Sequence, residues 1–391
     1  MTTIQARITP QLLKWARKRM SLSHDMLAYK IGVKAEQVVG WEEGAMRPTF
    51  KQAQELARHL RVPFGYLYLS SPPKETVPLP DTRTIGGRKL RRPSPDFIDV
   101  LNDMTLKQEW YKEYLQDERQ QPLTFIGKFK LGDDVKAVSR DITTTLEIDD
   151  TLRRESTDWE EFLTKLVRRC ESLGVLIVRN SVVGNNNLRT LSVNEFRGFA
   201  ICDELAPLIF INSQDSKTAQ IFTLVHELVH LWIGESAISN PDLKKRTSQQ
   251  TNVSERFCNQ VAAEILIPEA AFVQSWNGDE SIEDNLRTLS KEFRVSTAVV
   301  LRRAYELEAL RYDEYIRYLK REEGKWKRRR GIKKETGDFY ILLSSRNSST
   351  LTRLLVEGVM GGKFLHRDAA RLLGVNVGTL QKISERLMGA A

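Results

Sequence analysis

The chain has few cysteines and few histidines for its length. Its 391 residues include three cysteines, an odd and sparse set made up of Cys170, Cys202 and Cys258. Such a set excludes a disulfide framework and favours a reducing cytoplasm as the location. Two of the five histidines, His226 and His230, lie four residues apart. This pair is the first place in the sequence to look for metal or acid–base chemistry.

Long apolar runs are also lacking. No run of roughly 18 apolar residues occurs, which excludes a helix that spans a membrane. Residues 1–20 are polar and basic and lack the apolar stretch of a secretory signal. We therefore expect a cytoplasmic protein with no membrane partner.

The charge balance is basic. Sixty lysines and arginines against 51 acidic residues give a formal net charge of +9, which favours a polyanionic partner such as nucleic acid. A hydrophobic fraction of 41% excludes wholesale disorder and a collagen-like repeat. At about 150 residues per domain, the length predicts two or three domains.

Shifts in composition divide the chain into five parts. Helical apolar spacing predicts a small all-α domain first, and a stretch rich in proline, glycine and arginine then predicts an extended basic linker. A helical connector, an α+β domain and a basic hinge with a small, mainly helical C-terminal domain follow. The expected bounds are 1–70, 71–96, 97–151, 152–324 and 325–391. In the α+β part, apolar runs predict strands at 175–178, 199–201 and 208–211.

One short pattern recurs three times, as LAYKIGV at 27–33, LSKEFRV at 289–295 and AARLLGV at 369–375. Each copy predicts a helix, a tight turn at Gly or Arg, and a Val that opens a second helix, which is typical of a helix-turn-helix. Two helices that merely pack at a steep angle give the same pattern. We favour that ordinary interpretation for the second and third copies.

The first copy has surroundings that fit DNA binding. The segment LAYKIGVKAEQVVGWEEGAMRPTFKQAQELARHLRV closely resembles the repressor-type (XRE, Cro/CI-like) domain, and the resemblance covers residues 8–69. It implies that the helix at 34–43 enters the major groove of duplex DNA. Carried over by position, the base-facing residues are Lys34, Ala35, Glu36, Gln37 and Gly40, and those near phosphates are Ser23, His24 and Arg47.

Sequence specificity from this helix is expected to be low. Gln37 suits an adenine edge and Glu36 accepts only from cytosine, whereas Ala35 and Gly40 have no side-chain hydrogen-bonding group. Binding should therefore depend mainly on phosphates and fall with salt. The alternative is a retained module for dimerisation or for holding another protein.

A second motif, HELVH, spans His226 to His230 within IFTLVHELVHLWIG. Positions i and i+4 share one helix face, so both imidazoles can reach one metal ion at roughly 2.1 Å. Glu227 lies on the neighbouring face, where it can hold water and take its proton. Because the rest of this helix is apolar, two imidazoles and a carboxylate would be costly to bury without a partner, and a metal supplies one. The motif predicts a bound Zn²⁺ or another divalent ion such as Mn²⁺.

The surrounding sequence closely resembles the ImmA/IrrE family of zinc metallopeptidases, over roughly residues 100–310. The matching pieces are FRGFAICDELAPLIFIN at 196–212, IFTLVHELVHLWIG at 221–234 and ERFCNQVAAEILIP at 255–268. The resemblance implies a zincin-like fold with Glu255 as the third metal ligand. The chain departs from the family with Cys258 in place of the usual alanine and Val261 in place of the usual phenylalanine. Cys258 and Glu264 remain alternative ligands.

The resemblance implies a zinc endopeptidase that cleaves a repressor-type regulator, with Glu227 as general base. Its expected setting is a stress-response, mobile-element or toxin–antitoxin circuit. We expect strand 208–211 to receive the substrate by β-addition. One alternative is a non-proteolytic repressor or antitoxin that uses the peptidase fold as a platform for a partner such as a cognate toxin. Another is self-cleavage in the linker. A homodimer is expected in each case.

Two basic stretches, 83–92 and 325–334, flank the expected peptidase domain. They are either solvated hinges or sites that collect single-stranded DNA, with Trp326 stacking on a base for roughly 1–3 kcal/mol. In the second case the bound strand would trigger cleavage.

Overall fold

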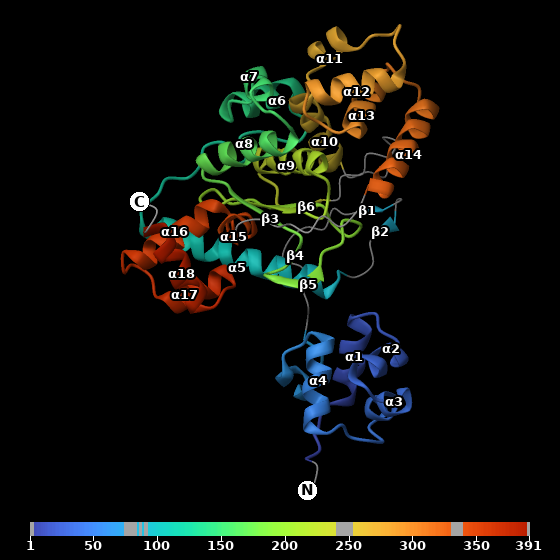
Figure 1. Ribbon diagram of the computed structural model, residues 1–391, viewed down its shortest axis with the longest axis vertical. Helices are drawn as coiled ribbons and strands as arrows, with labels where there is room; N and C mark the ends of the chain where they lie inside the picture. The colour runs from blue at the N-terminus through green and yellow to red at the C-terminus, as the bar shows by residue number, and fades with distance from the viewer. Residues whose placement is uncertain are drawn as a thin grey trace. The chain divides into compact units, whose positions relative to one another are not determined.

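The computed structural model describes residues 4–73, 84–85, 88–89, 93–239, 253–329 and 339–388 (Figure 1). Most of the predicted linker at 71–96 and the second half of the basic stretch at 325–334 lie outside these residues. The chain divides into two compact units, residues 1–78 with 92–99 and residues 79–91 with 100–391. Of the described helices, none is long and apolar enough to cross a membrane.

The first unit is all-helical. Its elements are α1 (Pro10–Arg19), α2 (His24–Ile31), α3 (Ala35–Glu43), α4 (Phe50–Leu60) and the 3₁₀ helix η1 (Phe64–Tyr68). The hydroxyl of Ser23 caps α2 by accepting from the Met26 N–H at 3.1 Å, and Gly32 ends it with φ 69°. Apolar residues at helical spacing form one core, including Leu13, Leu27, Val38, Trp41 and Leu56. The predicted all-α helix-turn-helix domain is confirmed.

A four-stranded mixed sheet organises the second unit. Its strands are β3 (Leu176–Asn180), β6 (Gly198–Ile201), β7 (Leu208–Asn212) and β8 (Ala237–Ser239), in the order β3-β7-β6-β8. β3 runs parallel to β7, and β6 is antiparallel to both β7 and β8. The carboxylate of Asp203 shapes the β6–β7 turn by accepting from the Leu205 and Ala206 N–H groups. Two further pairs are β1 (Thr84–Ile85) with β2 (Arg88–Lys89), and β4 (Val182–Val183) with β5 (Asn186–Thr190).

The position of β7 corrects one expectation. Strand 208–211 was expected to receive a substrate chain, yet β7 pairs with β3 on one side and β6 on the other. Its backbone groups are committed on both sides, so an added strand cannot pair with it. Within the described sheet, the edge strands are β3 and β8.

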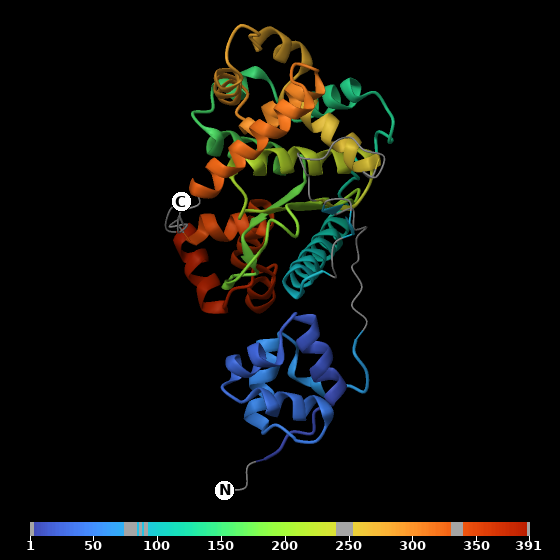
Figure 2. The ribbon, with the colours of Figure 1, turned by 90° about the vertical axis from the view of Figure 1, so that its right-hand side faces the viewer.

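Helices make up most of the rest of this unit. In chain order they are α5 (Pro95–Asp117), α6 (Val135–Thr145), α7 (Asp150–Arg154), α8 (Trp159–Ser172), α9 (Lys217–Ile233), α10 (Val253–Leu266), α11 (Glu269–Ser275), α12 (Ile282–Glu292), α13 (Thr297–Glu306) and α14 (Tyr312–Arg329). Helix α9 packs on β6 and β7 and also contacts α8 and α10 (Figure 2). Because α14 continues to Arg329, the first half of stretch 325–334 is helix and not the predicted hinge.

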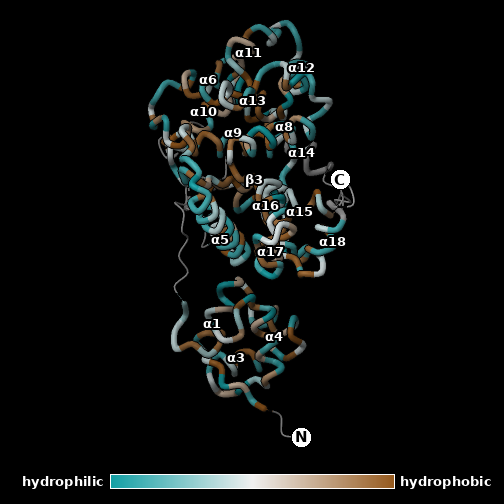
Figure 3. The backbone as a smooth tube through the Cα atoms, turned by 90° about the vertical axis from the view of Figure 1, so that its left-hand side faces the viewer, coloured by the Kyte–Doolittle hydropathy of each residue, from teal (hydrophilic) through white to brown (hydrophobic). Residues whose placement is uncertain are grey.

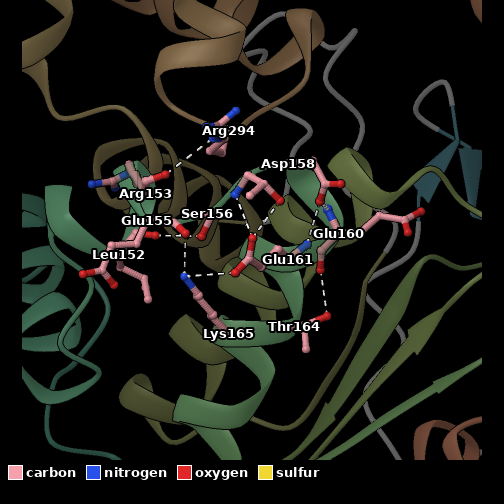
Figure 4. Close-up of polar contacts among 11 residues, drawn as sticks. Leu152, Arg153, Glu155, Ser156, Asp158, Glu160, Glu161, Thr164, Lys165 and Arg294 are labelled. Atoms are coloured by element: carbon pink, nitrogen blue, oxygen red, sulfur yellow. Dashed lines mark hydrogen bonds and ion pairs between the residues drawn. The ribbon is translucent and has the colours of Figure 1, made fainter.

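Polar contacts fix the junction between α7 and α8 (Figure 4). The carboxylate of Asp158 caps α8 by accepting from the Glu160 and Glu161 N–H groups, both at 2.9 Å. The buried Arg153 in α7 donates to the carbonyl of Ile265 at 2.8 Å, and Arg303 donates to the carbonyl of Ile267 at 3.0 Å. These two arginines satisfy carbonyls at the C-terminal end of α10 that the helix itself leaves without donors. They thereby anchor the helix that carries Glu255.

A C-terminal bundle completes the second unit. It consists of α15 (Phe339–Asn347), α16 (Ser349–Met360), α17 (His366–Leu373) and α18 (Val377–Met388), which lie together in Figure 3. α15 and α16 pack against β3, and Phe364 contacts the rings of Trp110 and Tyr114 on α5. The predicted fold class, an all-α domain followed by an α+β domain with a small helical C-terminal part, is confirmed.

Candidate metal centre and nucleic-acid interface

Helix α9 is surrounded by protein along most of its length. Ser216 caps its start by accepting from the Ala219 N–H at 3.2 Å, and Gly234 ends it with φ 75°. Every residue from 220 to 233 is buried. A polar side chain in this segment must therefore find its partners inside the protein.

Three such side chains meet between α9 and α10. Nε2 of His226 lies 3.4 Å from Oε2 of Glu255, and Nε2 of His230 lies 3.6 Å from Oε1 of the same carboxylate. One ligand atom from each residue lies within 4.8 Å of the other two. The two imidazoles meet edge to face, with ring centroids 5.1 Å apart. The structure thus brings together the two helix-spaced histidines and the glutamate that the family resemblance implied.

The chemistry of this group fits a divalent cation. Both histidines are fully buried, and among the described residues neither ring nitrogen of His226 has a hydrogen-bond partner. A buried polar atom that lacks a hydrogen bond costs about 1–3 kcal/mol. Two imidazoles and one carboxylate form a donor set that leaves a coordination position open on a tetrahedral ion. A cation at this position would complete the polar contacts of His226.

The protonation states also suit a metal. Burial would raise the pKa of Glu255, but the charges of His226 and His230 beside its carboxylate outweigh burial and hold that pKa well below its usual range. Burial lowers the pKa of His230, although Glu255 opposes the shift. A metal requires neutral imidazoles as ligands, and the lowered pKa of His230 favours that form.

The two alternative ligands are placed differently. Cys258 is buried in α10, and burial together with the charges of Glu255 and Glu227 raises the pKa of its thiol well above the usual range. A thiol must lose its proton to bind a metal, so this environment disfavours it as a ligand. Glu264 forms an ion pair with Arg303 and accepts from the Glu269 N–H at 3.3 Å. Neither residue belongs to the described three-residue group.

Glu227 is buried on the side of α9 that faces β6. A Cβ built on Gly198 in β6 would lie 2.9 Å from Oε1 of Glu227 and 2.6 Å from Cγ2 of Thr223. Only a glycine therefore lets the strand pass this close to the carboxylate. Sequence reasoning missed Gly198, and the one available signal was a glycine directly before the strand expected at 199–201.

The predicted DNA-facing residues differ in exposure. Lys34, Glu36 and Arg47 are exposed, while Ala35 and Gln37 are half-buried, with Oε1 of Gln37 accepting from the Lys34 N–H at 3.2 Å. Gly40 is buried against Met46, whose Cε would lie 2.5 Å from a Cβ at this position. The prediction that Gly40 faces bases is therefore corrected, because the side chain of Met46 covers it.

The predicted phosphate contacts have partners of their own. Ser23 is exposed, and its hydroxyl accepts the N–H that caps α2. His24 pairs with Glu42 at 3.1 Å, and Arg17 donates to both carboxylate oxygens of Glu42 at 2.6 and 2.9 Å. Sequence reasoning missed this three-residue network, which connects α1, α2 and α3 through one buried carboxylate.

Family models recognise both units. Residues 170–305 match the M78 peptidase family, described as the IrrE N-terminal-like domain. This part of the chain is similar to the IrrE N-terminal-like domain. His226, Glu227, His230 and Glu255 all lie inside the match. Residues 13–67 match the helix-turn-helix family and form an XRE-type domain, so both resemblances are confirmed. No curated protein matches the chain.

Proposed function

We propose that this DNA-binding regulator with a peptidase-like domain is a cytoplasmic zinc endopeptidase that cleaves a repressor-type regulator. The observation that carries the proposal is the buried group of His226, His230 and Glu255, whose ligand atoms lie within 4.8 Å of one another. The IrrE N-terminal-like domain supports it, because that family is one of metal-dependent peptidases.

In this proposal each residue has one role. His226, His230 and Glu255 hold the ion. A divalent ion held there would supply a positive charge that polarises a peptide carbonyl and acidifies water. Glu227, the neighbour of His226, takes the proton from water as general base and later donates it to the leaving amine. The contact with Gly198 fixes the position of that carboxylate.

The helix-turn-helix domain would bring the peptidase to duplex DNA. Exposed Lys34 and Arg47 supply positive charge, whereas α3 offers few side chains that distinguish bases. We propose that binding depends mainly on phosphates. A homodimer, a cognate toxin, self-cleavage and a trigger by single-stranded DNA stay predictions, as do the five domain boundaries and the choice between Zn²⁺ and Mn²⁺.

One observation favours a second candidate function. The proposed metal ligands His226, His230 and Glu255 (the metal group) are almost completely buried, and so is Glu227. A peptide must reach these residues before it can be cut. A DNA-binding repressor or antitoxin that uses the peptidase fold only to hold a partner has no such requirement.

Metal analysis of the purified chain, followed by incubation with repressors encoded beside it, separates the two candidates. The peptidase proposal expects one equivalent of metal and a defined cut that Glu227→Gln abolishes while the metal stays bound. Glu280→Gln, at an exposed carboxylate, serves as the matched control and should cleave normally. Metal binding without any cut in a repressor or in the chain itself would favour the platform.

A further inference from the structure

The three sequence copies of the helix-turn-helix pattern fold with the same local geometry. The N–H of Val33, Val295 and Val375 donates to the carbonyl of Ala28, Ser290 and Ala370, at 3.0, 3.1 and 2.9 Å. The residue before each Val has a positive φ, of 69°, 55° and 66°. In each copy the second helix begins two residues after the Val, as α3, α13 and α18 do.

The third copy also repeats the core positions of the first. Val38 and Trp41 of α3 are buried, and their equivalents in α18 are the buried Leu380 and Ile383. Leu27 and Ala28 of α2 correspond in the same way to Ala369 and Ala370 of α17. Helices α17 and α18 therefore meet at the same positions as the two helices of the DNA-binding pair.

The second and third copies differ in how exposed the latter of their two helices is, α13 in the second copy and α18 in the third. From 293 to 307, α13 and its flanks have no exposed residue, and α14 packs along this helix. Helix α18 instead presents an exposed face at Asn376, Val377, Gly378, Gln381 and Lys382. Asn376, Val377 and Gly378 occupy the positions of Lys34, Ala35 and Glu36 in the first copy. The second copy is thus an internal packing unit, as its sequence suggested, and the third has its equivalent surface available.

The described exposed side chains of this surface have a small excess of positive charge, and Arg367 pairs with Asp368. Arg367 and Arg371 are exposed on α17 and Lys382 on α18, against the acidic Asp368 and Glu385. Arg371 takes the position of Tyr29, and Lys382 takes that of the buried Gly40. We propose that α17 and α18 form a second duplex-DNA-binding helix-turn-helix, with Lys382 and Arg371 on phosphates and the Asn376 end of α18 in the major groove. This differs from the ordinary packing that the sequence favoured for this copy.

Contacts with the peptidase-like part hold this second motif in place. The side-chain amide of Asn185, between β4 and β5, donates to the carbonyls of Gly374 and Leu373 at 2.8 and 3.2 Å. Glu171 of α8 accepts from the Ser348 hydroxyl at 2.6 Å and from the Ser349 N–H at 2.8 Å, at the start of α16. Duplex bound at α17 and α18 would therefore be fixed relative to the domain that carries the metal group.

The test measures binding of the full chain to a fluorescent duplex of arbitrary sequence over a range of salt concentrations. The background variant Lys34→Glu/Arg47→Glu weakens the N-terminal motif, so that the remaining affinity reports on other sites. Adding Arg371→Glu/Lys382→Glu should weaken binding about ten-fold and reduce the salt slope by roughly 2, because two phosphate contacts are lost. The matched control Arg353→Glu reverses an exposed charge on α16 of the same bundle and should change affinity less than about two-fold.

Four results would overturn the proposal. In the first, the background variant binds no duplex. In the second, Arg371→Glu/Lys382→Glu and the control Arg353→Glu reduce the affinity for duplex equally. The third is competition by a single strand as strong as that by duplex. A protein that binds this face while duplex binding stays unchanged in Arg371→Glu/Lys382→Glu would assign the surface to protein docking instead. None of these outcomes depends on whether the metal group cleaves a peptide.

Discussion

Gly198 and Glu227 lie so close that a single added carbon would stand 2.9 Å from the carboxylate oxygen. The same carbon would meet Thr223 at 2.6 Å and the backbone carbonyl of Phe210 at 3.0 Å. Helix α9 and the neighbouring strand β7 therefore enclose this position, and the missing side chain sets where the proposed general base can lie.

Gly198→Ala should disturb the proposed base more than the metal ligands. We expect unfolding to become easier by about 1–3 kcal/mol, because the extra methyl group overpacks a closed space. Cleavage should fall much further than metal content. Gly278→Ala is the control, since nothing lies within 4 Å of a Cβ there. Denaturant unfolding, elemental analysis and a cleavage assay make the comparison, and full activity in Gly198→Ala would contradict the proposed position of Glu227.

The third ligand can be assigned by substitutions along α10. Glu255→Ala should lose most of the bound metal, since it removes the only carboxylate of the described group. Cys258→Ser should retain a full equivalent. Glu264→Ala should also retain metal, although it leaves the buried Arg303 without its ion pair and should lower stability by about 3–5 kcal/mol. Metal retained in Glu255→Ala but lost in Cys258→Ser would make the cysteine the ligand.

Acid should destabilise the helix-turn-helix domain through Glu42. Burial alone would raise the pKa of Glu42, but Arg17 and His24 outweigh it and hold that pKa below the ordinary value of 4.5. A depressed carboxyl pKa contributes stability that is present above 4.5 and is lost as pH falls through the folded value. Thermal unfolding of the full chain, followed by hydrogen exchange in α1–α3, should show this loss.

Glu42→Gln tests the same network at neutral pH. It should destabilise the domain by about 3–5 kcal/mol, because Arg17 stays buried without its charge partner, and it should flatten the acid dependence. Glu36→Gln removes an exposed carboxylate on the same helix and is the matched control. An unchanged acid dependence in Glu42→Gln would assign the loss to other carboxylates.

Glu171→Ala should loosen the C-terminal bundle without unfolding the peptidase-like domain. The substitution removes the acceptor for Ser348 and Ser349 at the start of α16, which costs roughly 0.5–2 kcal/mol for a helix cap. We expect faster hydrogen exchange over 349–360 and unchanged exchange in α9. Glu160→Ala, at an exposed site on the same helix, should leave both segments unchanged. Faster exchange in α9 as well would show that the bundle and the core open together.

The sequence predicted that His226 and His230 lie side by side, because this juxtaposition is local. Two histidines four residues apart share a face in any α-helix, and the apolar flanks indicate that this face is buried. Glu255 came from the family resemblance, since no local pattern distinguishes it from Glu264. The structure places Glu264 against Arg303, a partner far away in sequence.

Features that depend on neighbours in space could not be predicted. The apolar run at 208–211 indicates a buried strand but not that β7 has a partner on both sides. The basic run after residue 324 suggested a hinge, yet lysine and arginine are good helix formers and α14 continues through it to Arg329. The three copies of one motif share a pattern, and only the packing of α14 on α13 shows which of them is covered.

The packing of α10 on α9 also couples ion binding to folding. His226 and His230 belong to one helix and Glu255 to the other, so the unfolded chain holds no preformed set of these ligands. An ion that binds only the folded arrangement adds its binding free energy to that of folding. Under the proposed function, the fraction of peptidase domain that is folded should therefore rise with the free ion concentration. A chelator, which removes the free ion, should lower the free energy of unfolding of that domain.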